Sequence, residues 1–154
     1  MKNFSLGLSL LSSLGLWMVG CGGSSSGGGC PSGQVECDGV CIDEIQPTLS
    51  SIQTGVFEIS CTASACHDAD LPQAMLELTS VSVSEANLVG VESTQVQGLR
   101  VTSGDSNASY LMNKLLGVNM APDTTRMPQL VPNGLCDAKI NVIRQWIDDG
   151  APVN

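Results

Sequence analysis

Residues 61–67 read Cys61-Thr-Ala-Ser-Ala-Cys66-His67, so two thiols separated by four residues are followed at once by an imidazole. His67 is the only histidine in the chain of 154 residues. Thiolate and imidazole groups are the protein ligands that suit soft metal ions and covalently held cofactors. The stretch therefore predicts a cofactor or metal site, with the flanking helices and loops arranged around it.

The order of the three groups favours covalent attachment of a c-type haem. Each thiol can form a thioether with a haem vinyl group, and the adjacent imidazole then reaches the iron from one face. The common motif has two residues between the cysteines, whereas Cys61 and Cys66 have four. Three alternatives stay open: a local disulfide beside an exposed histidine, a zinc site that would need a fourth ligand, and a cysteine nucleophile with histidine as its base.

A six-coordinate iron also needs a ligand on its second face, and thioether sulfur is the usual one. Met127 stands in an Arg-Met-Pro stretch just before the last predicted helix and is our first choice. Met120 is a close rival, and Met75 and Met112 are further competitors. Met112 lies on a predicted helix, where methionine commonly fills gaps in packing.

Apolar periodicity predicts a mostly α domain of three to four short helices with long loops. We expect helices over residues 47–59, with Pro47 in the first turn, over 84–89, capped by Ser82 or Ser84, and from Ser106 or Asn107 to about Leu116, ending at Gly117. The first of these rests on a stripe of Leu49, Ile52, Val56 and Ile59. Residues 121–134 are predicted to be loop.

The last helix is the clearest of the predicted elements. Ile140, Ile143, Trp146 and Ile147 form one apolar stripe. Asp137 stands in the first turn, and Gly150 with Pro152 ends the helix.

Together these stretches resemble a single-haem, class I type cytochrome c domain of the kind carried by bacterial surface lipoproteins. The resemblance covers roughly residues 47–154, and the matching stretches are 56–68, 86–89, 104–105, 109–111, 126–128 and 143–152. It implies a small cytochrome c-like bundle in which Cys61 and Cys66 carry the thioethers, His67 is the proximal ligand and Met127 the distal ligand. It also implies that Trp146 lies near the haem edge and that the chain transfers single electrons to a redox partner protein instead of catalysing a reaction.

The N-terminus is typical of an exported bacterial lipoprotein. Residues 1–20 form a short basic start and an apolar stretch, which together predict a signal peptide. Met-Val-Gly-Cys at its end resembles a lipobox, so Cys21 is expected to carry the lipid anchor; an ordinary secretory signal is the alternative. Residues 21–29 are a Gly/Ser linker, expected to be a disordered tether. Gly22 does not resemble an inner-membrane retention signal, so we expect the outer membrane, on its periplasmic face or the cell surface.

Residues 30–46 predict a small Cys-rich knot between the tether and the helical domain. Asp38-Gly39 between two short Val-containing runs predicts a tiny hairpin. An oxidising compartment would join Cys30, Cys37, Cys41 and Cys136 in two disulfides, and three pairings are possible. Three cysteines of the knot cannot pair among themselves, so we expect one bridge to Cys136.

Composition limits the classes of function. The formal net charge is −9, and loss of Lys2 with the signal peptide would make it one unit more negative. A charge of this sign argues against a protein that binds nucleic acid. Aromatic residues make up only 3%, which indicates either a weak core or one completed by disulfides or a large cofactor. The sequence leaves two hypotheses: a tethered c-type cytochrome with one covalent haem, and a non-haem, disulfide-stapled surface lipoprotein with a binding or structural role. The sequence contains no paired carboxylates, nucleophile elbow or phosphate loop, so no catalytic motif points to an enzyme.

Overall fold

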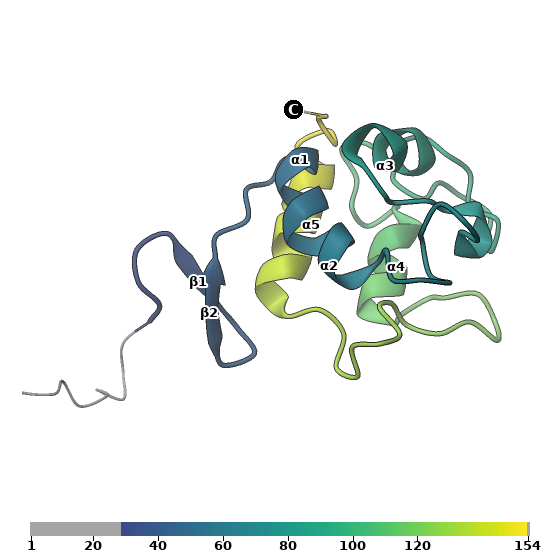
Figure 1. Ribbon diagram of the computed structural model, residues 1–154. Coiled ribbons are helices and arrows are strands. Elements are labelled where there is room, and N and C mark those ends of the chain that lie inside the picture. Colours follow the sequence, from purple (N-terminus) through teal and green to yellow (C-terminus); the bar gives the residue numbers. More distant parts are fainter. Residues whose placement is uncertain (1–28, 154) are drawn as a thin grey trace, which may run out of the picture.

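The computed structural model describes residues 29–153, and these form a small, mostly helical domain with a two-stranded hairpin at one side (Figure 1). The elements in chain order are β1 (Gln34–Cys37), β2 (Val40–Asp43), α1 (Leu49–Ile52), the π-turn η1 (Gln53–Phe57), α2 (Glu58–Ser60), the short 3-10 turn η2 (Gln73–Met75), α3 (Val81–Leu88), α4 (Tyr110–Leu116) and α5 (Asp137–Asp148). Because α1, η1 and α2 are continuous, the domain has four helices, which confirms the predicted helical class. The predicted signal peptide and Cys21 lie outside the described residues.

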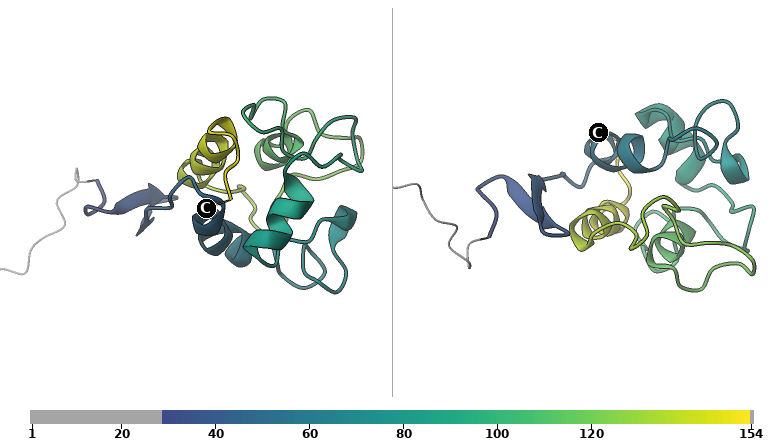
Figure 2. Two further views of the ribbon diagram at one scale, coloured as in Figure 1. Left: turned by 90° about the horizontal axis from the view of Figure 1, so that it is seen from above. Right: turned by 60° about the horizontal axis from the view of Figure 1, so that its bottom comes forward.

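The predicted hairpin is present and is tied to the helical domain. β1 and β2 pair antiparallel, with Cys37 opposite Val40. Asp38 and Gly39 both have positive φ, 54° and 84°, which suits a two-residue turn whose twist matches the strands. Disulfides join Cys30 to Cys41 and Cys37 to Cys136, so the expected bridge from the knot to Cys136 is confirmed. Figure 2 shows the hairpin projecting from the domain beside the start of α5.

The first helix departs from its predicted stripe because it contains a π-turn. Leu49, Ile52 and Val56 are fully buried, as expected, but Ile59 is 71% exposed. A π-turn adds one residue to the turn and therefore shifts the phase of the helix. The shift buries Phe57 instead of Ile59. The helix also begins later than expected, with the Thr48 hydroxyl capping it and Pro47 outside it.

Two predicted N-caps were wrong. The hydroxyl of Ser80, and not that of Ser82 or Ser84, accepts from the Val83 amide at the start of α3. α4 begins at Tyr110, later than a cap at Ser106 or Asn107 would allow. The reason is a tight turn in which Asp105 Oδ1 accepts from the amides of Asn107 and Ala108, so this segment does not join the helix.

The helix ends and the terminal helix follow the prediction. Gly117 ends α4 in the left-handed region, with φ 74°, and Gly150, with φ 97°, follows α5. Ile140, Ile143, Trp146 and Ile147 all face the core. α5 packs beside α1, and both helices contribute to one apolar core (Figures 1 and 2). Among residues 29–153, none of the helices has the length and apolar character needed to cross a bilayer.

Candidate functional site

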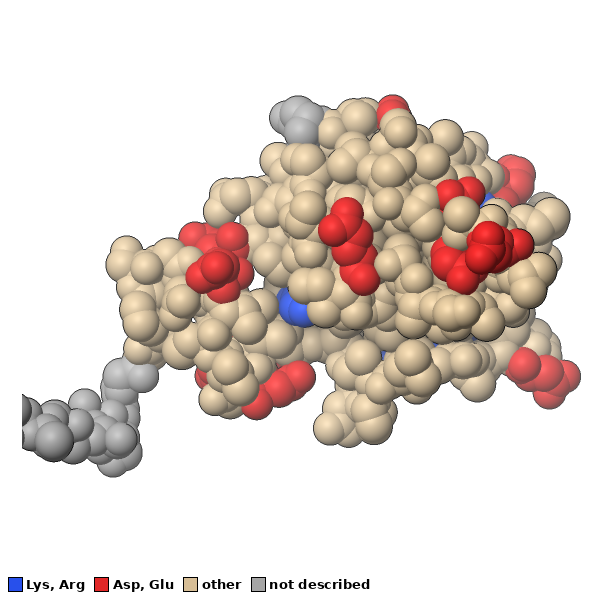
Figure 3. Space-filling view, in the orientation of Figure 1, with Lys and Arg blue, Asp and Glu red and all other residues tan. Residues whose placement is uncertain are grey.

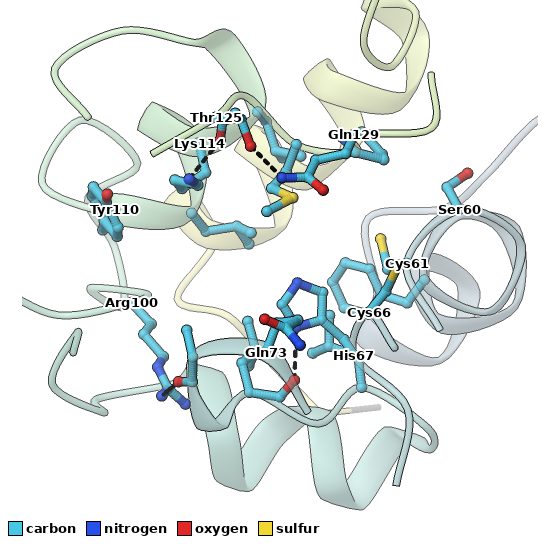
Figure 4. A pocket seen from close by; sticks show the side chains of 18 of the residues that line it. Ser60, Cys61, Cys66, His67, Gln73, Arg100, Tyr110, Lys114, Thr125 and Gln129 are labelled. Carbon is cyan, nitrogen blue, oxygen red and sulfur yellow. Dashed lines mark hydrogen bonds between the residues drawn. The ribbon is translucent and has the colours of Figure 1, made fainter. Parts of the chain in front are cut away.

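A cavity of about 520 Å³ lies between the first helix, α3, α4 and the loop that precedes α5 (Figure 4). Its wall is mostly apolar, and its size is within the range of small-molecule and cofactor sites. Apolar lining residues are Val56, Phe57, Leu76, Leu78, Leu88, Leu111, Leu115, Leu135 and Ile143. Four of the five predicted cofactor residues, Cys61, Cys66, His67 and Met127, line this cavity, although they come from distant parts of the chain.

Backbone hydrogen bonds close residues 61–67 into a compact loop. The Cys61 amide still donates to the Phe57 carbonyl, at 2.8 Å, so the first thiol is fixed at the end of the helix. The His67 amide then donates back to the Cys61 carbonyl, at 3.1 Å. Ala65 takes a positive φ of 63° inside this loop, and its amide donates to Asp68. The four residues between the cysteines therefore form a side loop, and both thiols and the imidazole reach one cavity.

The imidazole of His67 is held in a defined orientation. Its Nδ1 lies 2.8 Å from the Leu76 carbonyl oxygen. Because a carbonyl can only accept, Nδ1 carries the proton and Nε2 keeps its lone pair. Burial lowers the pKa of His67, with the hydrogen bond to Leu76 opposing that effect, so the neutral ring is favoured. Figure 4 shows the ring rising into the cavity from the wall opposite Thr125 and Gln129.

Cys61 and Cys66 are free thiols, whereas the other four cysteines of the described chain are paired. The local disulfide considered as an alternative does not form in this structure. Burial raises the pKa of Cys61 to about 12, the charge of Cys66 adds to the rise, and Lys139 partly opposes it. A thiol with such a pKa is protonated at neutral pH and is a poor nucleophile.

Met127 is the one methionine that lines the cavity among those in residues 29–153. Met112 is buried in the core, and Met75 is 70% exposed. Met75, Met112 and Met120 do not line the cavity. Thr125 and Gln129, on either side of Met127 in the sequence, lie on the wall that faces His67 (Figure 4). Met127 is therefore better placed than Met120 to act opposite the histidine.

Trp146 is buried but does not line the cavity. Its exposed fraction is 0%, and its indole N–H donates to the Pro152 carbonyl at 2.9 Å. It packs in the core with Ile143, which does reach the cavity wall. The Trp146 side chain thus joins the last turns of α5 to the segment that follows the helix.

Two buried cations, Arg100 and Lys114, also line the cavity and were not anticipated from the sequence. Each is only 8% exposed. Arg100 donates to the carbonyls of Asn87, Ala74 and Met75, at 2.8, 2.9 and 3.2 Å. Lys114 donates to the Thr125 carbonyl, at 2.5 Å.

Within residues 29–153, neither cation pairs with a carboxylate. Burial lowers the pKa of both Arg100 and Lys114, although a nearby Tyr110 partly opposes this for Lys114. Asp123, the carboxylate on this wall, is exposed and forms no hydrogen bond or ion pair with them. Two desolvated positive charges without a counter-charge make the cavity suited to an anionic group.

Searches of protein-family models, curated proteins and solved structures found no match to this chain. Its function is therefore inferred from the cavity. The described residues contain no cluster of three or more His, Cys, Asp and Glu side chains that could hold a single metal ion. The cavity instead offers an apolar interior, two thiols at one side, a single oriented imidazole nitrogen, a thioether and two buried cations.

Proposed function

We propose that this chain is a membrane-tethered, single-haem c-type cytochrome that transfers single electrons. Cys61 and Cys66 would hold the haem through thioethers, and His67 Nε2 and the Met127 sulfur would bind its iron. The bound haem would supply a one-electron iron couple, and a methionine ligand favours a high potential. The chain's own residues supply attachment, orientation and exclusion of water.

The observation that carries this proposal is the hydrogen bond from His67 Nδ1 to the Leu76 carbonyl. Metal-binding histidines commonly donate their second ring nitrogen to a carbonyl, which fixes the tautomer and the ring orientation. Here that bond leaves Nε2 as the free lone pair in a cavity that both free thiols and Met127 also line.

The rest of the cavity fits the chemistry of the group. An apolar wall suits the porphyrin face, and would compensate for an aromatic content of only 3%. Haem also carries carboxylates, and the two buried cations, Arg100 and Lys114, would gain a counter-charge from them. This charge match supports haem over a neutral apolar ligand.

The location of the protein is part of the same proposal. The disulfides agree with an exported protein, because they persist in oxidising compartments. Cys21 would carry the lipid anchor, probed by mass spectrometry of the N-terminal peptide in the wild type and in Cys21→Ser. Most of the face in Figure 3 is uncharged, and its charged side chains are mainly acidic with few basic ones. This agrees with a protein partner and a lipid anchor instead of electrostatic binding to nucleic acid or anionic lipid.

Expression together with a haem-attachment system tests the proposal. The purified protein should be red, with a Soret band that survives acid-acetone extraction. Replacing both Cys61 and Cys66 with Ala should allow extraction of the haem, whereas replacing Cys30 and Cys41 should not. A colourless wild type with a third disulfide between Cys61 and Cys66 would favour the non-haem lipoprotein and refute the cytochrome.

A further inference from the structure

The loop between α4 and α5 is long and carries Met127, yet its central part is fixed against the end of α4. The Met127 amide donates to the Lys114 carbonyl, at 2.9 Å. Lys114 in turn donates from its ammonium group to the Thr125 carbonyl. The carbonyls in the last turn of a helix have no partner within the helix, so a neighbouring segment can bind them.

Arg126 provides a second attachment, and its side chain points away from the cavity wall. Its Nε donates to the Leu115 carbonyl at 2.7 Å, and its NH1 group donates to the Asn133 carbonyl at 2.9 Å. It lines a separate recess with the carboxylates of Glu36 and Asp38, and does not line the cavity. One planar guanidinium therefore joins the end of α4 to the far end of the loop.

Two glycines make room for this side chain. A Cβ on Gly134 would lie 2.3 Å from Arg126 Cζ, and a Cβ on Gly117 would lie 3.1 Å from its Cδ. Both glycines also have positive φ, 76° and 74°. The loop therefore closes tightly around the arginine, in a way that no other residue at positions 117 or 134 would permit without a shift.

We propose that Arg126 is a positioning residue that holds Met127 on the cavity wall. The inference rests on the proposed function for its consequence at the iron, because Arg126 does not itself reach the cavity. Loss of the guanidinium frees the Leu115 and Asn133 carbonyls and lets residues 123–130 move away from the cavity wall. A competing ligand then displaces the Met127 sulfur from the iron more readily. Partners that orient metal ligands typically contribute 10- to 100-fold to metal affinity.

The test uses the haem-loaded protein and titrates it with imidazole, following the near-infrared sulfur-to-iron band. Arg126→Ala should bind imidazole with an apparent affinity about 10- to 100-fold higher than the wild type. Arg126→Lys keeps the charge but cannot reach both carbonyls, so it should fall between the two. Arg144→Ala is the matched control, since this arginine on α5 makes none of these contacts, and it should match the wild type.

A second variant moves the arginine without removing it. Gly134→Ala should reproduce the effect of Arg126→Ala, whereas Gly104→Ala, at a similar φ of 81° with no atom within 4 Å of its Cβ, should not. Hydrogen exchange at the Met127 amide should be faster in both Arg126→Ala and Gly134→Ala than in the wild type. If both variants are red, keep the sulfur-to-iron band and show unchanged imidazole affinity and unchanged exchange, the positioning role of Arg126 is refuted, whereas the proposed cytochrome is not. A colourless wild type would refute the cytochrome, and the exchange comparison would still decide whether Arg126 fixes the loop.

Discussion

The disulfide between Cys37 and Cys136 should contribute more to stability than the one between Cys30 and Cys41. The first closes a loop of 99 residues and the second a loop of 11. In the loop-entropy account, a cross-link of the longer kind raises the free energy of unfolding by about 4.7 kcal/mol and the shorter by about 2.8 kcal/mol. Replacing Cys37 and Cys136 together by Ala should therefore cost about 2 kcal/mol more than replacing the other pair.

Urea unfolding followed by far-ultraviolet circular dichroism gives both free energies by linear extrapolation. The slope of free energy against urea should rise more in the variant that lacks the long cross-link, because its unfolded state becomes less compact. The difference matters for the site, since Cys136 follows Leu135, which lines the cavity, and precedes α5. Equal losses in the two variants, or a larger loss from the short loop, would refute this reasoning.

Four further results are expected, three at single side chains and one in the pH dependence of stability. Ser84→Ala removes the donor that satisfies the buried Gln53 amide oxygen at 2.7 Å, which should lower the free energy of unfolding by about 1–3 kcal/mol. The Cys61 pKa of about 12, against 9.0 for an ordinary thiol, should slow its alkylation about 1,000-fold at pH 8 in the haem-free protein. Met127→Ala should abolish the sulfur-to-iron band and lower the potential of the haem-loaded protein, whereas Met120→Ala should leave both unchanged.

Each of these results has a contrary outcome. Ser82→Ala, an exposed position on the same helix, is the control for Ser84, and equal losses at the two serines would contradict the buried hydrogen bond. Alkylation of Cys61 as fast in the native protein as in urea would contradict its burial. The fourth result concerns pH. Between pH 9 and 12 the folded state keeps the Cys61 proton, whereas the unfolded chain loses it. The free energy of unfolding of the haem-free protein in urea should therefore fall as the pH rises through this range. Loss of the sulfur band in Met120→Ala alone would make that residue the ligand.

The elements that sequence predicted well are those set by local chemistry. The turn at Asp38 and Gly39 requires positive φ at two successive positions, and Asp-Gly supplies it. α5 has a continuous apolar stripe and a glycine just beyond its end. The first helix was predicted at this place in the chain, but it begins at Leu49 instead of Pro47 and its phase differs. Gly55 lies in its π-turn, with Ile45 only 2.8 Å from where a Cβ would stand, so this turn involves a contact from outside the helix.

The candidate site divides in the same way. Cys61, Cys66 and His67 lie within one short stretch of sequence, so their joint presence at one cavity could be predicted from a motif. Arg100 and Lys114 could not, because their partners are backbone carbonyls, which carry no signal in the sequence and lie 11 to 26 residues away. Buried cations are recognisable only after folding shows which chain segments surround them.

The mass of the peptide that contains Cys61 and Cys66 tests the central proposal most directly. Protein made with a haem-attachment system should yield this peptide with one added haem, and only two disulfides in the rest of the chain, Cys30–Cys41 and Cys37–Cys136. The account predicts that the haem stays on the peptide after acid-acetone extraction. An unmodified peptide, or one with a Cys61–Cys66 disulfide and no haem, would contradict it.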